Sequence, residues 1–364
     1  MPLMGNAHLH SCSNGPLIPM MLLQISAAVL ASTFPCPERC HCDPTIKSLH
    51  CMGPMRLAEL PARFRSSIEQ LHMSLSNESV LNRTAIGALP HLRAISLSRC
   101  GLQTFSEEAL PEMWHLRKLD LSYNFFQHLP ADFSNGLWAL QSLILSSNHI
   151  VRLTGMSLKG FDSLEKLFLD DNGMTSIEPN AFGTLTRLRQ LKLNGNRLVQ
   201  LPAGTFWGLR DLEVLDLHGS CVKSLDDFTF AFLGRLSILA LDHNNLTAIN
   251  YKAFLDMQTN GVQLLFSGNS WVCDCDLQHA FSKMHATQHL ALPDYANLRC
   301  HRPLPLQNHT LASVDGQLCI AETATVLVLA LSVAITVIAA IAMAEHQRKR
   351  SSTQHWYNEE GQHG

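Results

Sequence analysis

Two pairs of side chains that can hold a metal ion or change charge lie in the middle of the chain, Asp216 with His218 and Asp242 with His243. Imidazole nitrogens and carboxylate oxygens are common zinc ligands, and a histidine beside a carboxylate can titrate near neutral pH. Either chemistry requires that two separate segments lie side by side. The alternative is a set of solvated surface residues. The sequence favours solvated surface residues, so we expect no metal ligand among them.

The chain carries none of the familiar catalytic motifs. It has no Gly-x-Ser-x-Gly, no His-Glu-x-x-His and no glycine-rich phosphate loop. The formal net charge of −3 argues against nucleic-acid binding, which leaves a strongly basic footprint. The 19 histidines are scattered and show no metal-ligand spacing. We therefore expect neither an enzyme nor a cofactor.

A repeat with a period of 24 residues organises the chain and must position these side chains. A small polar residue recurs at this period, at Cys100, Asn124, Asn148, Asn172, Asn196, Ser220 and Asn244. Apolar residues precede each of them at fixed spacing, as Leu116, Leu119 and Leu121 do ahead of Asn124. A degenerate repeat precedes the series, with Ser76 in the polar position. The pattern L-x-x-L-x-L-x-x-N/C-x-L is that of a leucine-rich repeat.

The leucine spacing predicts one short strand in each repeat. Leu119 and Leu121 are two positions apart, so both point into the core from one strand. Each asparagine can hydrogen-bond the backbone of its own turn and of its neighbour, and the small Cys100 and Ser220 can replace it. No repeat can bury its apolar side alone, so the repeats must stack. We predict an α/β leucine-rich-repeat solenoid with a curved parallel sheet on its concave face.

Side chains that point out of the concave face are the candidates for binding a partner. Most of them are polar, but Ile144 and Phe168 are apolar neighbours on adjacent predicted strands. Such side chains can anchor a protein partner, with Tyr123, Asp170 and Lys192 around them. Isolated exposed apolar residues are also ordinary on protein surfaces, and the sequence leaves both interpretations open.

Two groups of four cysteines flank the repeats. They are Cys36, Cys40, Cys42 and Cys51 before the repeats, and Cys273, Cys275, Cys300 and Cys319 after them. The ends of a solenoid need covers. In a secretory setting disulfides are favoured over zinc, the competing interpretation. Of the remaining cysteines, we expect Cys100 to be a buried thiol and Cys221 to be accessible.

These flanks resemble the cysteine-rich caps of extracellular leucine-rich-repeat membrane proteins, over roughly residues 36–319. The run from Cys36 to Cys42 is similar to the amino-terminal cap, and the run from Asn269 to Cys275 to the carboxy-terminal cap, with Ser270 in place of the usual proline. The resemblance implies the bridges Cys36–Cys42, Cys40–Cys51, Cys273–Cys300 and Cys275–Cys319. It is specific for fold and not for function, because the family includes adhesion molecules, receptor ectodomains and channel subunits.

Two apolar segments predict the placement of the chain. Residues 17–31 end in small residues and resemble a secretory signal, although no Lys or Arg precedes them. Residues 324–344 contain no charge and are long enough to span a bilayer. The basic run Arg348-Lys349-Arg350 follows and belongs on the cytosolic side. We expect a single-pass type I protein of the plasma membrane, with its repeats outside the cell.

Two further patterns fit this placement. Acceptor sequons for N-glycosylation occur at Asn77, Asn82, Asn245 and Asn308. Within the span, Ser332, Thr336, Ala340 and Ala344 form a stripe of small side chains, which lets membrane helices approach closely. An alternative explanation of the stripe is the high alanine content of the span.

The predicted domains are a signal peptide (1–31), an amino-terminal cap (32–67), the repeats (68–260), the last strand with the carboxy-terminal cap (261–319), a transmembrane helix (324–344) and a cytoplasmic tail (345–364). Two functions follow. The first is a cell-surface recognition or adhesion protein that binds a protein through its concave face. The second is an auxiliary subunit that modulates a channel or receptor in the same membrane through its helix. The short tail and the cap adjoining the span resemble the small subunits that accompany large-conductance potassium channels.

Overall fold

The structure is a computed structural model that describes residues 36–54, 59, 67–75, 80–81, 89–105, 113–130, 133–254, 257, 259, 261–314, 316 and 318–360. The chain divides into two compact units, Met1–Glu38 and Arg39–Gly364. All the strands and helices of the described residues lie in the second unit. The predicted signal segment, the turn at Ser76 and the sequons at Asn77 and Asn82 lie outside the described residues.

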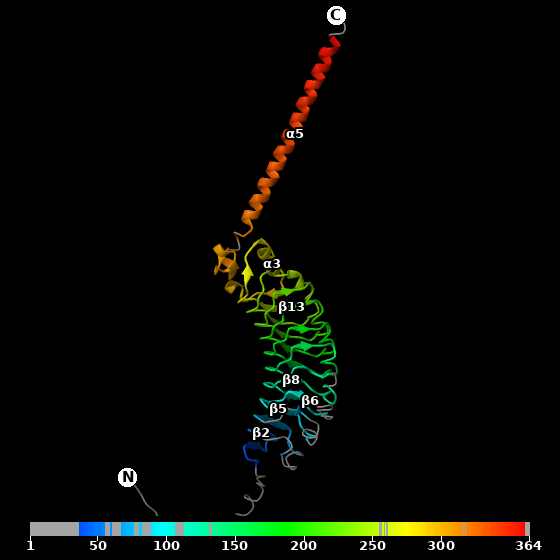
Figure 1. Ribbon diagram of the computed structural model, residues 1–364, viewed down its shortest axis with the longest axis vertical. Coiled ribbons are helices and arrows are strands. Elements are labelled where there is room, and N and C mark those ends of the chain that lie inside the picture. Colours follow the sequence, from blue (N-terminus) through cyan, green and yellow to red (C-terminus); the bar gives the residue numbers. More distant parts are fainter. Residues whose placement is uncertain are drawn as a thin grey trace, which may run out of the picture. The chain divides into compact units, whose positions relative to one another are not determined.

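One long sheet contains a strand from every repeat (Figure 1). Its strands, in spatial order, are β1 (Cys40–Asp43), β2 (Ser48–Met52), β3 (Gln70–Ser74), β5 (Ala94–Ser98), β7 (Lys118–Asp120), β8 (Ser142–Ile144), β10 (Lys166–Phe168), β12 (Gln190–Lys192), β14 (Val214–Asp216), β16 (Ile238–Ala240), β17 (Val262–Leu265) and β19 (Leu290–Ala291). Strands β1 and β2 pair antiparallel, and every later pair is parallel. The parallel sheet of the predicted solenoid is therefore confirmed.

The buried leucines and the asparagine ladder hold consecutive repeats together. Leu119 and Leu121 have no exposed surface, as their spacing predicts. The Asn148 amide donates to the carbonyls of Leu121 and Leu145, both at 3.0 Å, and its Oδ1 accepts the Phe126 N–H at 3.2 Å. Each ladder asparagine thus satisfies backbone groups that the turn would otherwise bury unpaired.

The two replacements in the ladder have no side-chain amide but still contact backbone carbonyls of the preceding repeats. Ser220 Oγ donates to the Leu193 carbonyl at 2.7 Å, and Cys100 Sγ lies 3.4 Å from the Met73 carbonyl oxygen. Cys100 is buried, as predicted. Small side chains therefore fit the ladder position, although they lack the amide group that both donates and accepts.

The segments that connect one strand to the next form the other side of the repeats, here called the connecting side. Short strands pair there in parallel: β4 (Val80–Leu81) with β6 (Thr104–Phe105), β9 (Arg152–Leu153) with β11 (Ser176–Ile177), and β13 (Gln200–Leu201) with β15 (Ser224–Leu225). Four buried phenylalanines stack at 5.4–6.2 Å between ring centroids, in the column Phe182, Phe206, Phe230 and Phe254. This aromatic spine adds to the buried apolar core of the repeats.

Both ends of the repeats are closed by disulfide-bonded caps. The bridges Cys40–Cys51, Cys273–Cys300 and Cys275–Cys319 are present, as the resemblance implied. The Cys36–Cys42 bridge stays a prediction. Strands β1 and β2 before the repeats and β19 after them extend the long sheet itself, so both caps are joined to the repeats by strand pairing.

The carboxy-terminal cap is built around Trp271, which is fully buried. It contains β18 (Trp271–Val272) paired with β20 (Cys300–Arg302), the helix α3 (Cys275–Ala286) and the short helix α4 (Leu311–Val314). Asp274 caps α3 through its side chain, which accepts the Leu277 N–H at 2.9 Å. This bond satisfies a donor that the first turn of a helix leaves free.

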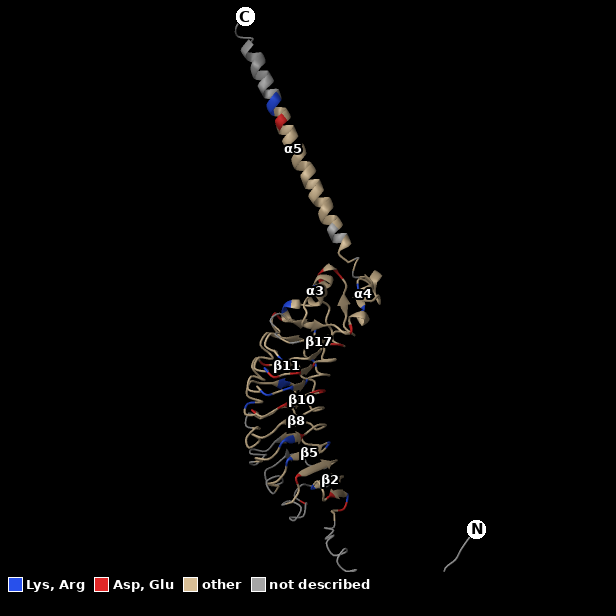
Figure 2. Ribbon diagram, turned by 180° about the vertical axis from the view of Figure 1, so that it is seen from behind, with Lys and Arg blue, Asp and Glu red and all other residues tan. Residues whose placement is uncertain are grey.

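The last element is a single long helix, α5 (Ile320–Glu360). Its segment Ala324–Lys349 is long and apolar enough to cross a membrane. The helix runs on into the predicted tail and does not end at residue 344. Figure 2 shows charged residues along the repeats, whereas the described charges of α5 lie near its C-terminal end.

Candidate functional site

The strand face, meaning the side of the long sheet whose side chains point away from the core, carries the predicted binding patch. Ile144, Phe168 and Lys192 end three successive strands, β8, β10 and β12. The Cα of Phe168 is in register with that of Ile144 on one side and of Lys192 on the other. The structure therefore brings these three residues into one row.

Lysine and phenylalanine interact within this row. Lys192 Nζ lies 5.4 Å from the centroid of the Phe168 ring, within the range of a cation–π contact. All three side chains are half-buried. The patch is therefore a partly covered apolar row with a positive charge at one end.

Asp170 lies beside this row, and Tyr123 contacts a different residue. Asp170 Oδ1 accepts the Ser146 Oγ–H at 2.7 Å from the neighbouring repeat. Tyr123 is half exposed at the turn after β7, where the guanidinium carbon of Arg99 lies 4.3 Å from its ring centroid. Both Arg99 and Tyr123 adopt a left-handed backbone, with φ near 56°. The Arg99–Tyr123 pair was not predicted, although the two residues precede ladder positions one repeat apart.

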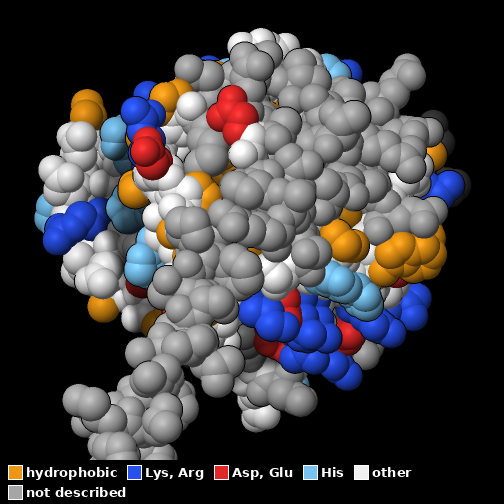
Figure 3. Space-filling model, turned by 90° about the horizontal axis from the view of Figure 1, so that it is seen from below, with side chains coloured by type: hydrophobic (Ala, Val, Ile, Leu, Met, Phe, Trp, Pro, Cys, Tyr) orange, Lys and Arg blue, Asp and Glu red, His pale blue; other side chains and the backbone are white. Residues whose placement is uncertain are grey.

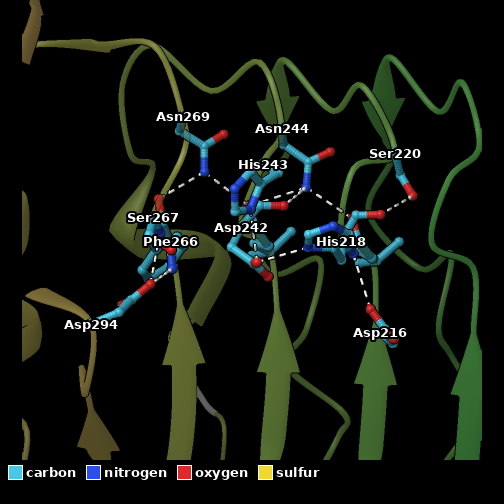
Figure 4. A network of polar contacts seen from close by, with 12 residues as sticks. Asp216, His218, Ser220, Asp242, His243, Asn244, Phe266, Ser267, Asn269 and Asp294 are labelled. Carbon is cyan, nitrogen blue, oxygen red and sulfur yellow. Dashed lines mark hydrogen bonds and ion pairs between the residues drawn. The ribbon is translucent and has the colours of Figure 1, made fainter. Parts of the chain in front are cut away.

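A second group of side chains on the strand face forms a hydrogen-bonded cluster, here called the histidine cluster: His218, Asp242 and His243 (Figure 4). Asp242 Oδ2 lies 2.7 Å from His218 Nδ1 and 3.0 Å from His243 Nδ1. The two imidazole centroids are 4.8 Å apart. Adjacent repeats thus bring together residues that the sequence keeps apart.

The electrostatics of the histidine cluster favour an ionised carboxylate. Partial burial raises the pKa of Asp242, but the hydrogen bonds from His218 and His243 outweigh burial and hold that pKa below its ordinary value. Asp216, grouped with them in the sequence, instead accepts the backbone N–H of His218 at 3.1 Å. It therefore fixes the turn that carries His218.

Ion pairs gather at the amino-terminal end of the sheet, a site that the sequence patterns did not predict. A hollow there is lined by Lys47, Ser67, Glu69, His91, Arg93 and His115. Glu69 bridges two cations, with Lys47 Nζ at 2.7 Å and Arg93 Nε at 3.1 Å. The hydrogen bond from Lys47 holds the pKa of Glu69 below its usual range. Figure 3 shows basic, acidic and histidine side chains together on this end of the molecule.

Exposed aromatic rings on the connecting side were also missed. Trp207 and Phe232 are more than half exposed, 6.4 Å apart between centroids, and line a hollow with Phe228. Gly208 lies in the same hollow at φ +97°, where a Cβ would meet the Gly183 carbonyl oxygen at 2.6 Å. A side chain at this position would collide with the backbone of the preceding repeat, so the position requires glycine.

The sequence also led to predictions for the two described sequons, the free thiol Cys221 and the small residues of α5. Asn245 and Asn308 are exposed, and Cys221 is a partly exposed thiol. In α5, Ser332 Oγ and Thr336 Oγ1 donate to carbonyls one turn earlier, both at 2.8 Å. These hydroxyls are therefore satisfied inside their own helix.

Comparison with known proteins agrees with the fold. The leucine-rich-repeat family model matches residues 114–174 and 162–222. No curated protein matches the sequence significantly. The chain is similar to the crystal structure of human 5T4, also named trophoblast glycoprotein, with 24% identity, a TM-score of 0.57, and coverage of 76% of this chain and 96% of that one.

Two further solved structures have the same fold. One is a chain of the octameric complex of latrophilin 3, Unc5D and the leucine-rich repeats of FLRT2, with 21% identity, a TM-score of 0.62, and coverage of 76% of this chain and 97% of that one. The other is the TLR13–ssRNA13 complex, with 22% identity, a TM-score of 0.56, and coverage of 70% of this chain and 40% of that one. The chain therefore has a leucine-rich-repeat fold with disulfide-bonded caps, and its described residues include one apolar helix long enough to cross a membrane.

Proposed function

We propose that the protein is a cell-surface recognition protein that binds a protein partner through the strand face, with its repeats outside the cell and α5 as its single membrane span. The observation that carries the proposal is the row Ile144–Phe168–Lys192. Two neighbouring apolar side chains stand there among polar ones, on successive strands held in register. Anchors of protein interfaces are typically large side chains of this kind, surrounded by polar groups.

The disulfides support an extracellular placement of the repeats. Disulfides persist in the oxidising extracellular environment and are rare in the cytosol. The FLRT2 repeats resembled by this chain belong to a complex with latrophilin 3 and Unc5D. The TLR13 structure instead contains RNA. The net charge of −3 disfavours that class of ligand here.

Proximity labelling on intact cells tests the proposal, because it tags any protein that lies beside the repeats, whatever its identity. The test variant carries Ile144→Ser and Phe168→Ser. Serine fits these positions, since Ser96 occupies the corresponding place on β5. The control variant carries Met156→Ser, a half-exposed methionine on the connecting side. We expect the patch variant to lose partners that the wild type and the control retain at equal surface levels. An unchanged set of labelled proteins would contradict the proposal.

A second function rests on α5. The apolar side chains of the segment Ala324–Lys349 are exposed throughout its described part, and the stripe of Ser332, Thr336 and Ala340 offers a surface for another membrane helix. The chain would then modulate a channel or receptor in the same membrane. Exchange of residues 324–344 for an unrelated span separates the two functions. Loss of modulation with normal surface delivery supports the subunit, whereas retained modulation or partner binding counts against it.

A further inference from the structure

We propose that the histidine cluster is a binding site for zinc on the strand face. Its three ligands come from two adjacent repeats, His218 from one and Asp242 and His243 from the next. Each of the three side chains, two imidazoles and one carboxylate, offers a ligand atom, and these atoms all lie within 4.8 Å of one another. Ligands of one tetrahedral zinc ion are separated by about 3.3 Å, given metal–ligand bonds of about 2.0–2.1 Å. Small side-chain rotations are therefore enough to place an ion between them.

The chemistry of the donors selects the type of metal. Two imidazoles with one carboxylate suit zinc, whereas calcium and magnesium prefer oxygen ligands throughout. Three protein ligands leave a fourth tetrahedral position open to water or another group. The side chains of His218 and His243 are 49% and 60% exposed, so an ion can enter directly from solvent. Asp242 is only 16% exposed and forms the floor of the site.

Two features of the surroundings fit a metal site. His243 lies over Gly268, where a Cβ would come within 2.7 Å of the imidazole Cδ2. The glycine thus leaves space for the ring to approach Asp242. The second feature is Asn194, which lies beside His218 in the preceding repeat. The side-chain oxygen of Asn194, Oδ1, is buried and has no hydrogen-bond partner among the described residues. An imidazole that binds zinc through Nδ1 keeps a proton on Nε2, and such protons are usually accepted by a nearby oxygen.

Calorimetric titration of the full-length protein in detergent micelles tests the proposal, with zinc chloride as the probe after chelator treatment. The variants are His218→Ala and His243→Ala, and the matched control is His289→Ala, an exposed histidine in the carboxy-terminal cap. We expect zinc to bind the wild type and the control alike, and each cluster variant to bind at least about tenfold more weakly. Magnesium at the same concentration should produce no such difference.

Cobalt absorption identifies the ligands independently of affinity. Cobalt at the histidine cluster should give the visible bands of a four-coordinate nitrogen and oxygen site, without the charge-transfer bands of a thiolate. These bands should disappear in His218→Ala and persist in His289→Ala. Equal zinc affinity and equal cobalt spectra in the wild type and both cluster variants would overturn the proposal. This outcome would leave the proposed protein binding untouched, because the row Ile144–Phe168–Lys192 is a separate set of residues.

Discussion

Lys192 on β12 places its ammonium 5.4 Å from the centroid of the Phe168 ring on β10. Phe168 is the middle residue of the proposed binding row and Lys192 is at one end, so the pair gives the row both an apolar surface and a charge. Because the lysine partly covers the ring, its removal has two effects. It weakens a local contact and exposes more of the phenylalanine.

We expect Lys192→Gln to lower the free energy of local opening around β10 and β12 by about 0.5 kcal/mol, the contribution of a cation–π contact at an exposed site. Native-state hydrogen exchange of the backbone amides in these strands measures this energy. Lys166→Gln, an exposed lysine at the start of β10, is the control and should leave exchange unchanged. Equal protection in all three proteins would show that the contact does not contribute to stability.

Replacing an asparagine of the ladder should destabilise the repeats more than replacing the ladder serine. Asn172 donates to the carbonyls of Leu145 and Leu169 and accepts the Ile150 N–H. Asn172→Ala leaves these buried groups unpaired, so we expect a loss of about 3 kcal/mol in local stability. Ser220→Ala removes a hydroxyl that donates chiefly to one carbonyl and should lose about 1 kcal/mol. Limited proteolysis at increasing urea concentration ranks the two, and equal losses would contradict the bonding pattern.

The amino-terminal repeats should weaken in mild acid because of His72. Burial, together with the nearby His50 and Lys118, holds the pKa of His72 below the ordinary value of 6.5. The unfolded chain therefore takes up a proton at a higher pH than the folded chain does. The resulting stability is fully present above about pH 6.5 and falls as the pH drops below it.

His72→Gln removes this proton uptake and should flatten the pH dependence of stability in β2, β3 and β5. Hydrogen exchange between about pH 7.5 and 5.5 provides the measurement. His289→Gln serves as an exposed control and should follow the wild type. An acid-induced loss of the same size in His72→Gln would assign the effect to other groups.

Glycosylation tests the side of the membrane on which the repeats lie. Asn245 and Asn308 are exposed and occupy acceptor sequons. In a secretory cell we expect Asn245→Gln and Asn308→Gln each to remove one glycan, seen as loss of a mobility shift after glycosidase treatment. If both variants, and a variant without Asn77 and Asn82, have the same electrophoretic mobility as the wild type, an extracellular placement of the repeats is contradicted.

The 24-residue period was enough to predict the fold because it records stacking directly. The positions of Leu119, Leu121 and Asn148 in the pattern already specify which groups are buried and which backbone atoms they bond. The bridges of the carboxy-terminal cap were predicted on a different basis, the resemblance of the run around Cys273 to known caps. The phenylalanine spine was missed because its residues lie outside the positions that define the repeat.

The candidate sites were less predictable, because side-chain contacts depend on rotamers that the period does not encode. The pattern placed Phe168 and Lys192 side by side, but it did not show that the lysine lies over the ring. It grouped Asp216 with the histidines, whereas the carboxylate bonds a backbone amide and Asp242 alone bonds both imidazoles. Arg99 pairs with Tyr123 through a left-handed turn, a geometry that neither residue type favours.

Site-specific photo-crosslinking tests the central claim, that the strand face binds a protein, most directly. A photoreactive amino acid is placed at Ile144, or at Met156 on the connecting side, in full-length protein on living cells. We expect the photoreactive residue at position 144 to cross-link one distinct protein, and Phe168→Ser to reduce this product. The same product should be absent when the photoreactive residue is at position 156. A cross-linked protein at position 156 with none at position 144 would contradict the claim.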